Sequence, residues 1–450
     1  MEGECDRYIL ISYNKAMNWK DKYNKIKMTG DEAVKLIKDG DTVVLGHAMG
    51  EPQELVEALS KNYQDYKDVE IVQMVPFTGE LAKEKYEGHF IYNSLFAGGS
   101  TRKAVQDGFA EFTPVFFHEV PKLFREKLID VNVAMIMVTP PDEHGYCSFG
   151  VSIDYTRPAA QEADIVIAQV NKYMPRTLGN SMIHINEIDA IVESHHKLPE
   201  LQPPKIGDIE KKIGEYCASL IKDEAVLQLG IGAIPDAVLT FLGDKKNLAL
   251  HTEMFSDGVI DLIENGVINN SKKSYMPNLS VSTFLMGTQR LYDFVDNNPS
   301  IYMASVDFVN NPAVISKNRR ITSLNSAIQV DLTGQVVAGT MGHKIFSGVG
   351  GQVDFVRGAA MANEGVSIIA FPSTASKGKI SKIVPDITAG SMVTTTNHDV
   401  DYIVTEFGIA KMRGKTLKKR AEALINIAHP DFRDELIAAY ESRYNCKFPR

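Results

Sequence analysis

Apolar runs and amphipathic stretches alternate along most of the chain. Residues 42–46 (TVVLG) and 69–75 (VEIVQMV) have the apolar pattern of buried strands, and residues 51–62 between them have the spacing of an amphipathic helix. This alternation is typical of layered α/β folds, in which helices cover a sheet. The longest apolar run, residues 131–138, is too short to cross a membrane and is predicted to be a core strand.

Two distant segments of the chain resemble each other. Residues 36–46 (LIKDGDTVVLG) and 220–230 (LIKDEAVLQLG) align without a gap, and each precedes small residues, a proline, an apolar helix pattern and another strand. This shared order predicts a duplicated α/β unit. The proline-rich residues 197–208 are predicted to be a linker between one α/β domain at 1–196 and a second at 209–450. We expect a small-molecule site in the cleft between them.

The composition is that of an ordinary globular protein. Of 450 residues, 44% are apolar and 23% are charged, and the length favours two domains over one. The net charge of −9 at pH 7 disfavours general binding to nucleic acid or to an anionic membrane surface. It leaves room for an anionic small molecule held by a local loop. We therefore expect small-molecule partners, no nucleic acid and no membrane.

The cysteines and the first residues both fit a reducing cytoplasm. The four cysteines are scattered and form no C-x-x-C pair, so neither a metal site nor a disulfide framework is expected. The N-terminal residues carry early acids and only a short apolar patch, unlike a secretory signal. A helical pattern begins near Met17, which makes Met17 an alternative to Met1 as the first residue.

An acidic residue follows an apolar strand pattern in residues 247–260 (NLALHTEMFSDGVI). Glu253 comes shortly after Leu250 and directly before Met254 and Phe255. The position is compatible with a solvated strand end, a hydrogen-bond acceptor for a ribose, or a nucleophile. The two apolar residues behind it are compatible with water exclusion at a site and equally with core packing.

A glycine-containing loop, residues 228–239 (QLGIGAIPDAVL), has the pattern of a strand, a turn and a helix start. Gly230 and Gly232 permit tight turns, and Pro235 suits the first helical position, so the free N–H groups and the helix dipole favour an anion. The alternative is a tight turn without a ligand. The glycines followed by Glu253 also fit a dinucleotide site, but Pro235 replaces the third glycine of that pattern. Dinucleotide binding is therefore the second hypothesis.

Other loops offer weaker candidates. In residues 346–359 (FSGVGGQVDFVRGA), Gly350 and Gly351 can direct backbone N–H groups to one point, as an oxyanion requires, although a hairpin-like turn before a strand at 352–356 is the alternative. Asn325 precedes residues 328–336, whose alternation predicts one strand. Lys377 lies in a loop where it is either a phosphate contact or simply solvated.

Together these motifs resemble the acetyl-CoA hydrolase/transferase family, and within it the CoA-transferases that act on short-chain acids such as 4-hydroxybutyrate and butyrate. The resemblance runs nearly end to end. It rests on residues 50–59, 139–156, 174–181, 227–238, 251–259, 346–359 and 408–416.

The resemblance implies a fold, a reaction and site residues. It implies two related open-sheet α/β domains of the CoA-transferase type, with the active site in the cleft between them. It makes Glu253 the nucleophile and gives Asn325 and the pair Gly350–Gly351 an oxyanion role. The coenzyme A site would be formed by Gly230, Ile231, Gly232, Ala233, Ile234, Ile328, Gly350 and Gly351. Gln53 would face the acyl pocket.

The implied reaction transfers CoA between butyryl-CoA or 4-hydroxybutyryl-CoA and acetate by a ping-pong mechanism through a glutamyl-CoA thioester. The CoA thioester is then a substrate, and no tightly bound cofactor is expected. A glutamate with a reference pKa of ~4.3 is expected to be ionised at pH 7 without a general base. Acyl-CoA hydrolysis on the same scaffold remains an alternative, as does an NAD-binding dehydrogenase or a nucleotide-binding regulatory module. Relatives suggest a homodimer or larger assembly.

Overall fold

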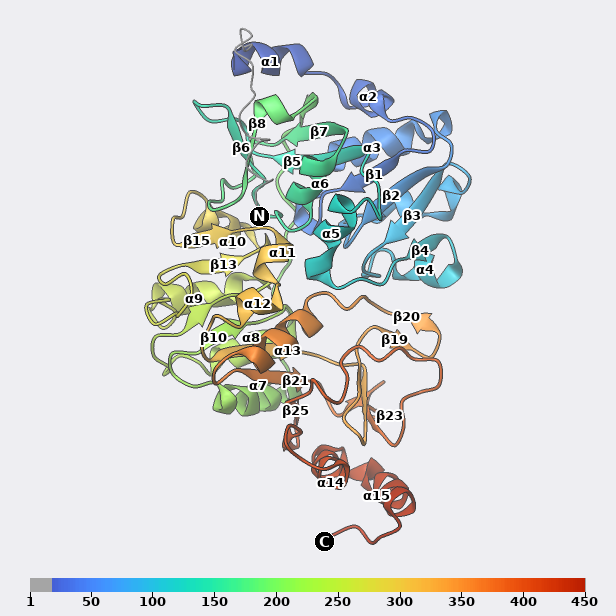
Figure 1. Ribbon diagram of the computed structural model, residues 1–450, viewed down its shortest axis with the longest axis vertical. Coiled ribbons are helices and arrows are strands. Elements are labelled where there is room, and N and C mark those ends of the chain that lie inside the picture. Colours follow the sequence, from blue (N-terminus) through green and yellow to red (C-terminus); the bar gives the residue numbers. More distant parts are fainter. Residues whose placement is uncertain (1–17, 450) are drawn as a thin grey trace, which may run out of the picture.

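Two parallel sheets, one from each half of the chain, organise the molecule (Figure 1). The computed structural model describes residues 18–449. The alternative first residues Met1 and Met17 lie outside the described residues. The first half of the chain forms the upper, blue-to-green part of Figure 1, and the second half forms the lower part, which runs from yellow-green to red.

The first sheet has seven parallel strands in the order β4-β3-β2-β1-β5-β7-β9. Its strands are β1 Thr42–Leu45, β2 Val69–Gln73, β3 Phe90–Ser94, β4 Ala110–Phe112, β5 Val133–Val138, β7 Ile165–Val170 and β9 Ala190–Glu193. The strands predicted at 42–46, 69–75 and 131–138 are confirmed as β1, β2 and β5. Every residue of β5 is buried, as a continuous apolar run in a covered parallel sheet requires.

The second sheet has six strands in the order β11-β10-β16-β21-β25-β26, parallel except for the last pair. They are β10 Val226–Gln228, β11 Ala249–Leu250, β16 Ile321–Asn325, β21 Val366–Ala370, β25 Tyr402–Thr405 and β26 Gly408–Lys411. In both halves a strand leads through a loop and a helix to a parallel neighbour. The two related open sheets confirm the predicted fold class, whereas the domain limits at 196 and 209 stay a prediction.

Helices connect and cover the strands. They are α1 Trp19–Ile26, α2 Gly30–Ala33, α3 Gln53–Lys61, α4 Arg102–Asp107, α5 Val120–Arg125, α6 Thr156–Glu162, α7 Asp208–Leu220, α8 Ala233–Thr240, α9 Ile260–Glu264, α10 Gln289–Val295, α11 Val306–Val309, α12 Pro312–Ile315, α13 Gln352–Met361, α14 Leu417–Ile427 and α15 Pro430–Tyr444. Helix α3 is the one predicted at 51–62. Within residues 18–449, no helix combines the length and apolar character that a membrane crossing needs.

Small ladders complete the structure. They are β6 Tyr146–Ser148 with β8 Met182–His184, β12 Met254–Phe255 with β14 Phe284–Leu285, β13 Ser280–Ser282 with β15 Ile301–Met303, β17 Gln329–Asp331 with β18 Val336–Val337 and β24 Ile383–Val384, β19 Thr340–Met341 with β20 Lys344–Ile345, and β22 Thr374–Ala375 with β23 Ile380–Ser381.

Two sequence predictions about the second half are wrong. Residues 328–336 do not form one strand, because β17 and β18 pair antiparallel across a turn in which the Asp331 carboxylate accepts backbone N–H groups of Thr333 and Gln335. Residues 352–356 are helical and begin α13. Apolar residues over so short a stretch fit both the strand period and the helix period. Between β17 and β18 the turn forms because the Asp331 carboxylate satisfies the local N–H groups.

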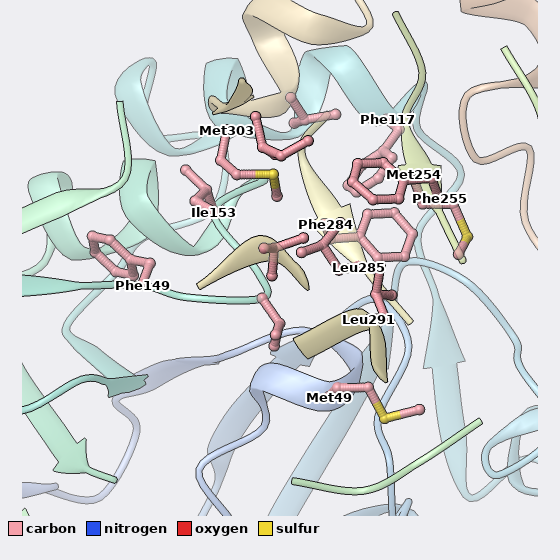
Figure 2. Packing of buried hydrophobic residues seen from close by; sticks show 14 of the residues in the cluster. Met49, Phe117, Phe149, Ile153, Met254, Phe255, Phe284, Leu285, Leu291 and Met303 are labelled. Carbon is pink, nitrogen blue, oxygen red and sulfur yellow. The ribbon is translucent and has the colours of Figure 1, made fainter. Parts of the chain in front are cut away.

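One hydrophobic cluster joins the two halves of the chain. Figure 2 shows Phe117 from the first half close to Phe284 from the second, and Met49 and Phe255 belong to the same cluster. Phe255 is 2% exposed and Met254 is 5% exposed. These two residues behind Glu253 therefore pack in the core that holds the halves together.

Close packing of α7 on α8 leads to a test of this fold. A Cβ at Gly214 would lie 2.9 Å from the backbone carbonyl carbon of Ala237, so we expect Gly214→Ala to lower the melting temperature. The overpacking cost of ~1–3 kcal/mol exceeds the gain in helix propensity of up to ~1 kcal/mol. Gly243→Ala is the control, because no atom lies within 4 Å of its added methyl group. Equal melting temperatures for both variants would contradict the packing described here.

Candidate active site around Glu253

The backbone fixes Glu253 between β11 and β12. Its carbonyl oxygen accepts hydrogen bonds from the backbone N–H groups of Thr283 at 3.0 Å and Phe284 at 3.2 Å. The hydroxyl of Ser282 donates to the same oxygen at 3.0 Å. Because three donors converge on one carbonyl, the segment carrying Glu253 has little freedom to move.

Two groups hold the carboxyl group of Glu253. The Asn310 side chain donates from Nδ2 to Glu253 Oε2 at 2.7 Å, and the backbone N–H of Gly351 also bonds the carboxylate. A Cβ at position 351 would lie 1.9 Å from Glu253 Oε2, so any residue other than glycine would displace the carboxylate. Gly350 has φ +52°, and a Cβ added there would lie 3.9 Å from the other oxygen, Oε1. The structure thus brings three of the predicted site residues together.

The surroundings raise the pKa of Glu253 to about 8. Although part of the residue is exposed, its carboxyl group is enclosed by protein, and this burial is the main cause. The negative charges of Asp354 and Asp154 add to it, whereas the hydrogen bonds from Asn310 and Gly351 oppose it. The site therefore makes the charged form costly, which opposes the expectation that this glutamate is ionised at pH 7 without a general base.

Three residues of the site gave no signal in the sequence. Asn310 follows α11 in a segment typical of helix caps. Asp354, in the first turn of α13, accepts a hydrogen bond from His118 Nδ1 at 2.7 Å and lies 3.5 Å from Asn310 Nδ2. Asn310, Asp354 and His118 come from separate elements. In the sequence, only Asp354 could have been noticed, because it follows the glycine cluster at 348–351.

A second buried pair lies close to the first. His47 Nδ1 is 3.1 Å from Asp154 Oδ2, and both residues are at most 1% exposed. The imidazole ring packs against Phe117, Tyr155 and Phe284, with a centroid distance of 4.5 Å to the last. Among residues 18–449, its Nε2 atom is buried without a hydrogen-bond partner.

The glycine loop and Asn325 line one cavity of about 350 Å³. The carboxyl ends of β10, β16 and β21 meet here, which is where parallel sheets place ligands. Thr252 Oγ1 donates to the carbonyl of Leu229 at 3.0 Å and so ties the segment carrying Glu253 to the loop. Asn325 donates from Nδ2 to Gln228 Oε1 at 3.1 Å. The predicted loop residues in the lining are Gly230, Ile231, Gly232, Ala233 and Ile234.

A second cavity, of about 320 Å³, opens between the two halves. Its walls are residues 112–119 of the first half and segments near 339–349 and 392–394 of the second. The loop carrying Gly350 is held across this boundary, because Arg102 Nε donates to the carbonyl of Phe346 at 2.6 Å and the Phe117 N–H donates to the carbonyl of Gly350 at 3.3 Å. The contact between Glu253 and the Gly350–Gly351 loop therefore lies next to the interface of the two halves.

The remaining predicted residues lie in different places. Gln53 is half-buried at the first position of α3, and Ile328 is half-buried just before β17. Lys377 is exposed in the turn between β22 and β23, with φ +58°. Within residues 18–449, no hydrogen bond or ion pair joins these three residues to Glu253, and their roles stay predictions. Within the described residues, no group of three or more His, Cys, Asp or Glu residues is arranged to hold a metal ion.

Known proteins resemble this chain over nearly its whole length. It is 58% identical to 4-hydroxybutyrate coenzyme A transferase of Clostridium kluyveri, over 95% of this chain and 100% of the relative. It is 39% identical to butyryl-CoA:acetate CoA-transferase of Anaerostipes caccae, over 94% and 97%. The solved structure of 4-hydroxybutyrate CoA-transferase from Porphyromonas gingivalis superposes with a TM-score of 0.83 at 42% identity, covering 95% of this chain and 100% of that one. RipA from Yersinia pestis gives 0.90 at 37%, covering 96% and 100%.

Family models match both halves. The N-terminal domain of acetyl-CoA hydrolase/transferase matches residues 12–201, and the C-terminal domain of the same family matches residues 287–440. Glu253 lies between the two matched ranges. Both domain matches and the full-length relatives lead to one conclusion: the chain belongs to the acetyl-CoA hydrolase/transferase family.

Proposed function

We propose that the protein transfers CoA between short-chain carboxylates, with butyryl-CoA or 4-hydroxybutyryl-CoA and acetate as substrates, and that Glu253 is the nucleophile. The observation that carries the proposal is a buried carboxylate held by an amide and a backbone N–H at the boundary of the halves. The names of the full-length relatives support the substrate class.

The reaction would proceed through two adducts on Glu253. The carboxylate attacks the acyl-CoA carbonyl carbon, the C–S bond breaks, and a mixed anhydride and a CoA thiolate form. The thiolate then attacks the glutamyl carbonyl, the anhydride C–O bond breaks, and the first acid leaves, with the glutamyl-CoA thioester remaining. A second carboxylate runs the same steps in reverse. The sequence needs no general base beyond an ionised Glu253.

The donors that hold Glu253 would also stabilise the addition steps. Negative charge develops on a carbonyl oxygen at each addition, and the N–H of Gly351 and the amide of Asn310 are already aimed at that carboxyl group. A donor fixed in such a place is worth ~3 kcal/mol in the transition state. Gly350 and Asn325 complete the proposed oxyanion and CoA contacts.

Coenzyme A would lie along the glycine loop. Gly230 and Gly232 leave the cavity open, because no atom lies within 4 Å of a Cβ added at either position. The phosphopantetheine arm and nucleotide can then supply binding energy far from the reacting carbonyl, which lowers the barrier of addition. Ile328, Lys377 and Gln53 keep their predicted roles within this proposal.

Hydrolysis on the same scaffold is the second candidate. Acetyl-CoA hydrolase of Kluyveromyces lactis is 33% identical over 46% of this chain. Hydrolysis would require water at the glutamyl adduct, and the apolar packing of Met254 and Phe255 behind Glu253 does not favour water there. Dinucleotide binding has less support, because Pro235 occupies the position of the third glycine and the family chemistry concerns CoA.

Trapping of the adduct tests the proposal. Incubation with butyryl-CoA, followed by intact-mass measurement and peptide mapping, is expected to place a CoA-sized adduct on the peptide containing Glu253. Glu253→Gln should abolish the adduct and lower exchange with acetate by at least ~10³-fold. The control is Glu264→Gln, an exposed acid paired with Arg290, which should exchange normally. Normal exchange by Glu253→Gln refutes the mechanism, and release of CoA without acetate identifies a hydrolase.

The raised pKa of Glu253 predicts the pH dependence of the reaction. Because only the ionised carboxylate attacks, kcat/KM for butyryl-CoA should rise about tenfold per pH unit below the pKa of about 8 and level off above it. Circular dichroism across the same pH range controls for unfolding. A profile that is flat from pH ~6 to 9 would mean that Glu253 is ionised throughout and would contradict the effect of burial.

Gly351 should be intolerant of a side chain. Gly351→Ala places a methyl group on Glu253 Oε2, so we expect a loss of at least ~10² in kcat with a native circular dichroism spectrum. Gly99→Ala is the matched control in another loop, since no atom lies within 4 Å of its added Cβ. Retention of normal activity by Gly351→Ala would show that the carboxylate does not use this position in the reaction.

A further inference from the structure

A buried amide joins the carboxyl group of Glu253 to a second carboxyl group. Asn310 Nδ2 donates to Glu253 Oε2 at 2.7 Å and faces Asp354 Oδ2 at 3.5 Å. Asn310 is fully buried, and both neighbours accept hydrogen bonds, so its nitrogen and not its oxygen must face them. The two carboxyl groups share one amide, and each therefore responds to the charge of the other.

Asp354 is bound on its other side by a histidine from the first half of the chain. His118 Nδ1 lies 2.7 Å from Asp354 Oδ1, and the His118 backbone N–H donates to Oδ2 at 3.3 Å. The Asp354 side chain is 1% exposed and that of His118 is 22% exposed, so His118 can exchange its proton with solvent. Burial is the largest single influence and lowers the pKa of His118, but the hydrogen bond with Asp354 and the negative charges of Asp354 and Glu119 together raise the pKa above its usual value.

The other titratable groups near Glu253 are either hydrogen-bonded to buried partners or neutral. Asp154 also repels the carboxylate, but it is hydrogen-bonded to His47 and to the hydroxyl of Ser152. His251 is fully buried, and burial lowers its pKa to about 3, so it is neutral. The Asp354–His118 pair differs from the His47–Asp154 pair in two ways: Asp354 shares the Asn310 amide with Glu253, and the His118 side chain is partly exposed to solvent.

The charges around His118 are balanced. Glu119 raises its pKa and Arg357 lowers it. Asp307, on the neighbouring helix α11, forms an ion pair with Arg125 at 2.6 Å. The dominant partner of His118 is therefore Asp354, across the boundary between the halves.

We propose that His118 and Asp354 are positioning residues that control the ionisation of Glu253 through Asn310. The imidazolium of His118 offsets the charge of Asp354. Without that offset, ionised Glu253 and Asp354 would face one amide as two uncompensated buried charges, which is strongly unfavourable. The inference rests on the proposed function, because it concerns the nucleophile of that reaction.

The pH profile of kcat/KM in two variants tests the inference. The acid limb is the part of the pH profile in which kcat/KM rises with pH as Glu253 ionises. His118→Asn keeps a donor near the position of Nδ1 but removes the charge, so the acid limb should move up by ~1 pH unit, with about a tenfold loss of kcat/KM at pH ~6.5. Asp354→Asn removes the repelling charge and should move the limb down. The double variant removes both charges and should lie near the wild type.

Shifts of opposite sign separate this role from a structural one. A structural role would lower kcat/KM in both variants at every pH and leave the limb in place, which would overturn the inference, as would shifts of the same sign. His144→Asn, an exposed histidine beside Glu143, is the control and should leave the limb unchanged. If melting curves show that Asp354→Asn does not fold, the limb of His118→Asn decides alone.

The outcome for Glu253 keeps the two proposals distinct. An unmoved limb in a protein that still forms the adduct on Glu253 overturns the inference alone. Normal exchange by Glu253→Gln overturns the proposed function. A rapid-quench experiment measures the rate of adduct formation on Glu253 at each pH. If this rate shows the same acid limb, product release is excluded as the cause of the limb.

Discussion

The placement of one carboxyl group, that of Glu253, in a region that excludes water governs the rest of the site. Burial and two neighbouring carboxylates disfavour its charge, and only Asn310 and the N–H of Gly351 oppose them. A carboxylate with few hydrogen bonds and a raised pKa is a better nucleophile than a solvated one, but it is also less often ionised. The surrounding residues must therefore keep the carboxylate reactive while leaving enough of it ionised.

The fold meets this requirement by bringing elements from both halves to one point. Glu253 follows β11 at the carboxyl edge of the second sheet, and its backbone is pinned by residues 282–284. The loop carrying Gly350 and Gly351 is tied to the first half through Phe117. A hydrophobic cluster shared by both halves contains Met254 and Phe255, which directly follow Glu253 (Figure 2). Rigidity at the glutamate thus depends on the contact between the halves.

Sequence patterns failed where short stretches fit more than one structure. Residues 352–356 have apolar letters compatible with a strand, yet they form the first turns of α13 after the glycine pair. Residues 328–336 alternate like a strand but turn at Asp331, whose carboxylate satisfies the local N–H groups. In both cases the interactions that determine the structure involve only a few residues. The pattern of apolar positions over so short a stretch therefore does not predict them.

The sequence by itself determined the α/β class, the duplicated unit, the strands at 42–46, 69–75 and 131–138, and Glu253 with its glycine loops as candidates, because these depend on local periodicity and on residue types. Only the tertiary structure decided that Asn310, Asp354 and His118 join Glu253, since they lie on separate elements up to 236 residues apart. It also decided the pKa of Glu253, because burial and the distance between charges arise only when the chain has folded.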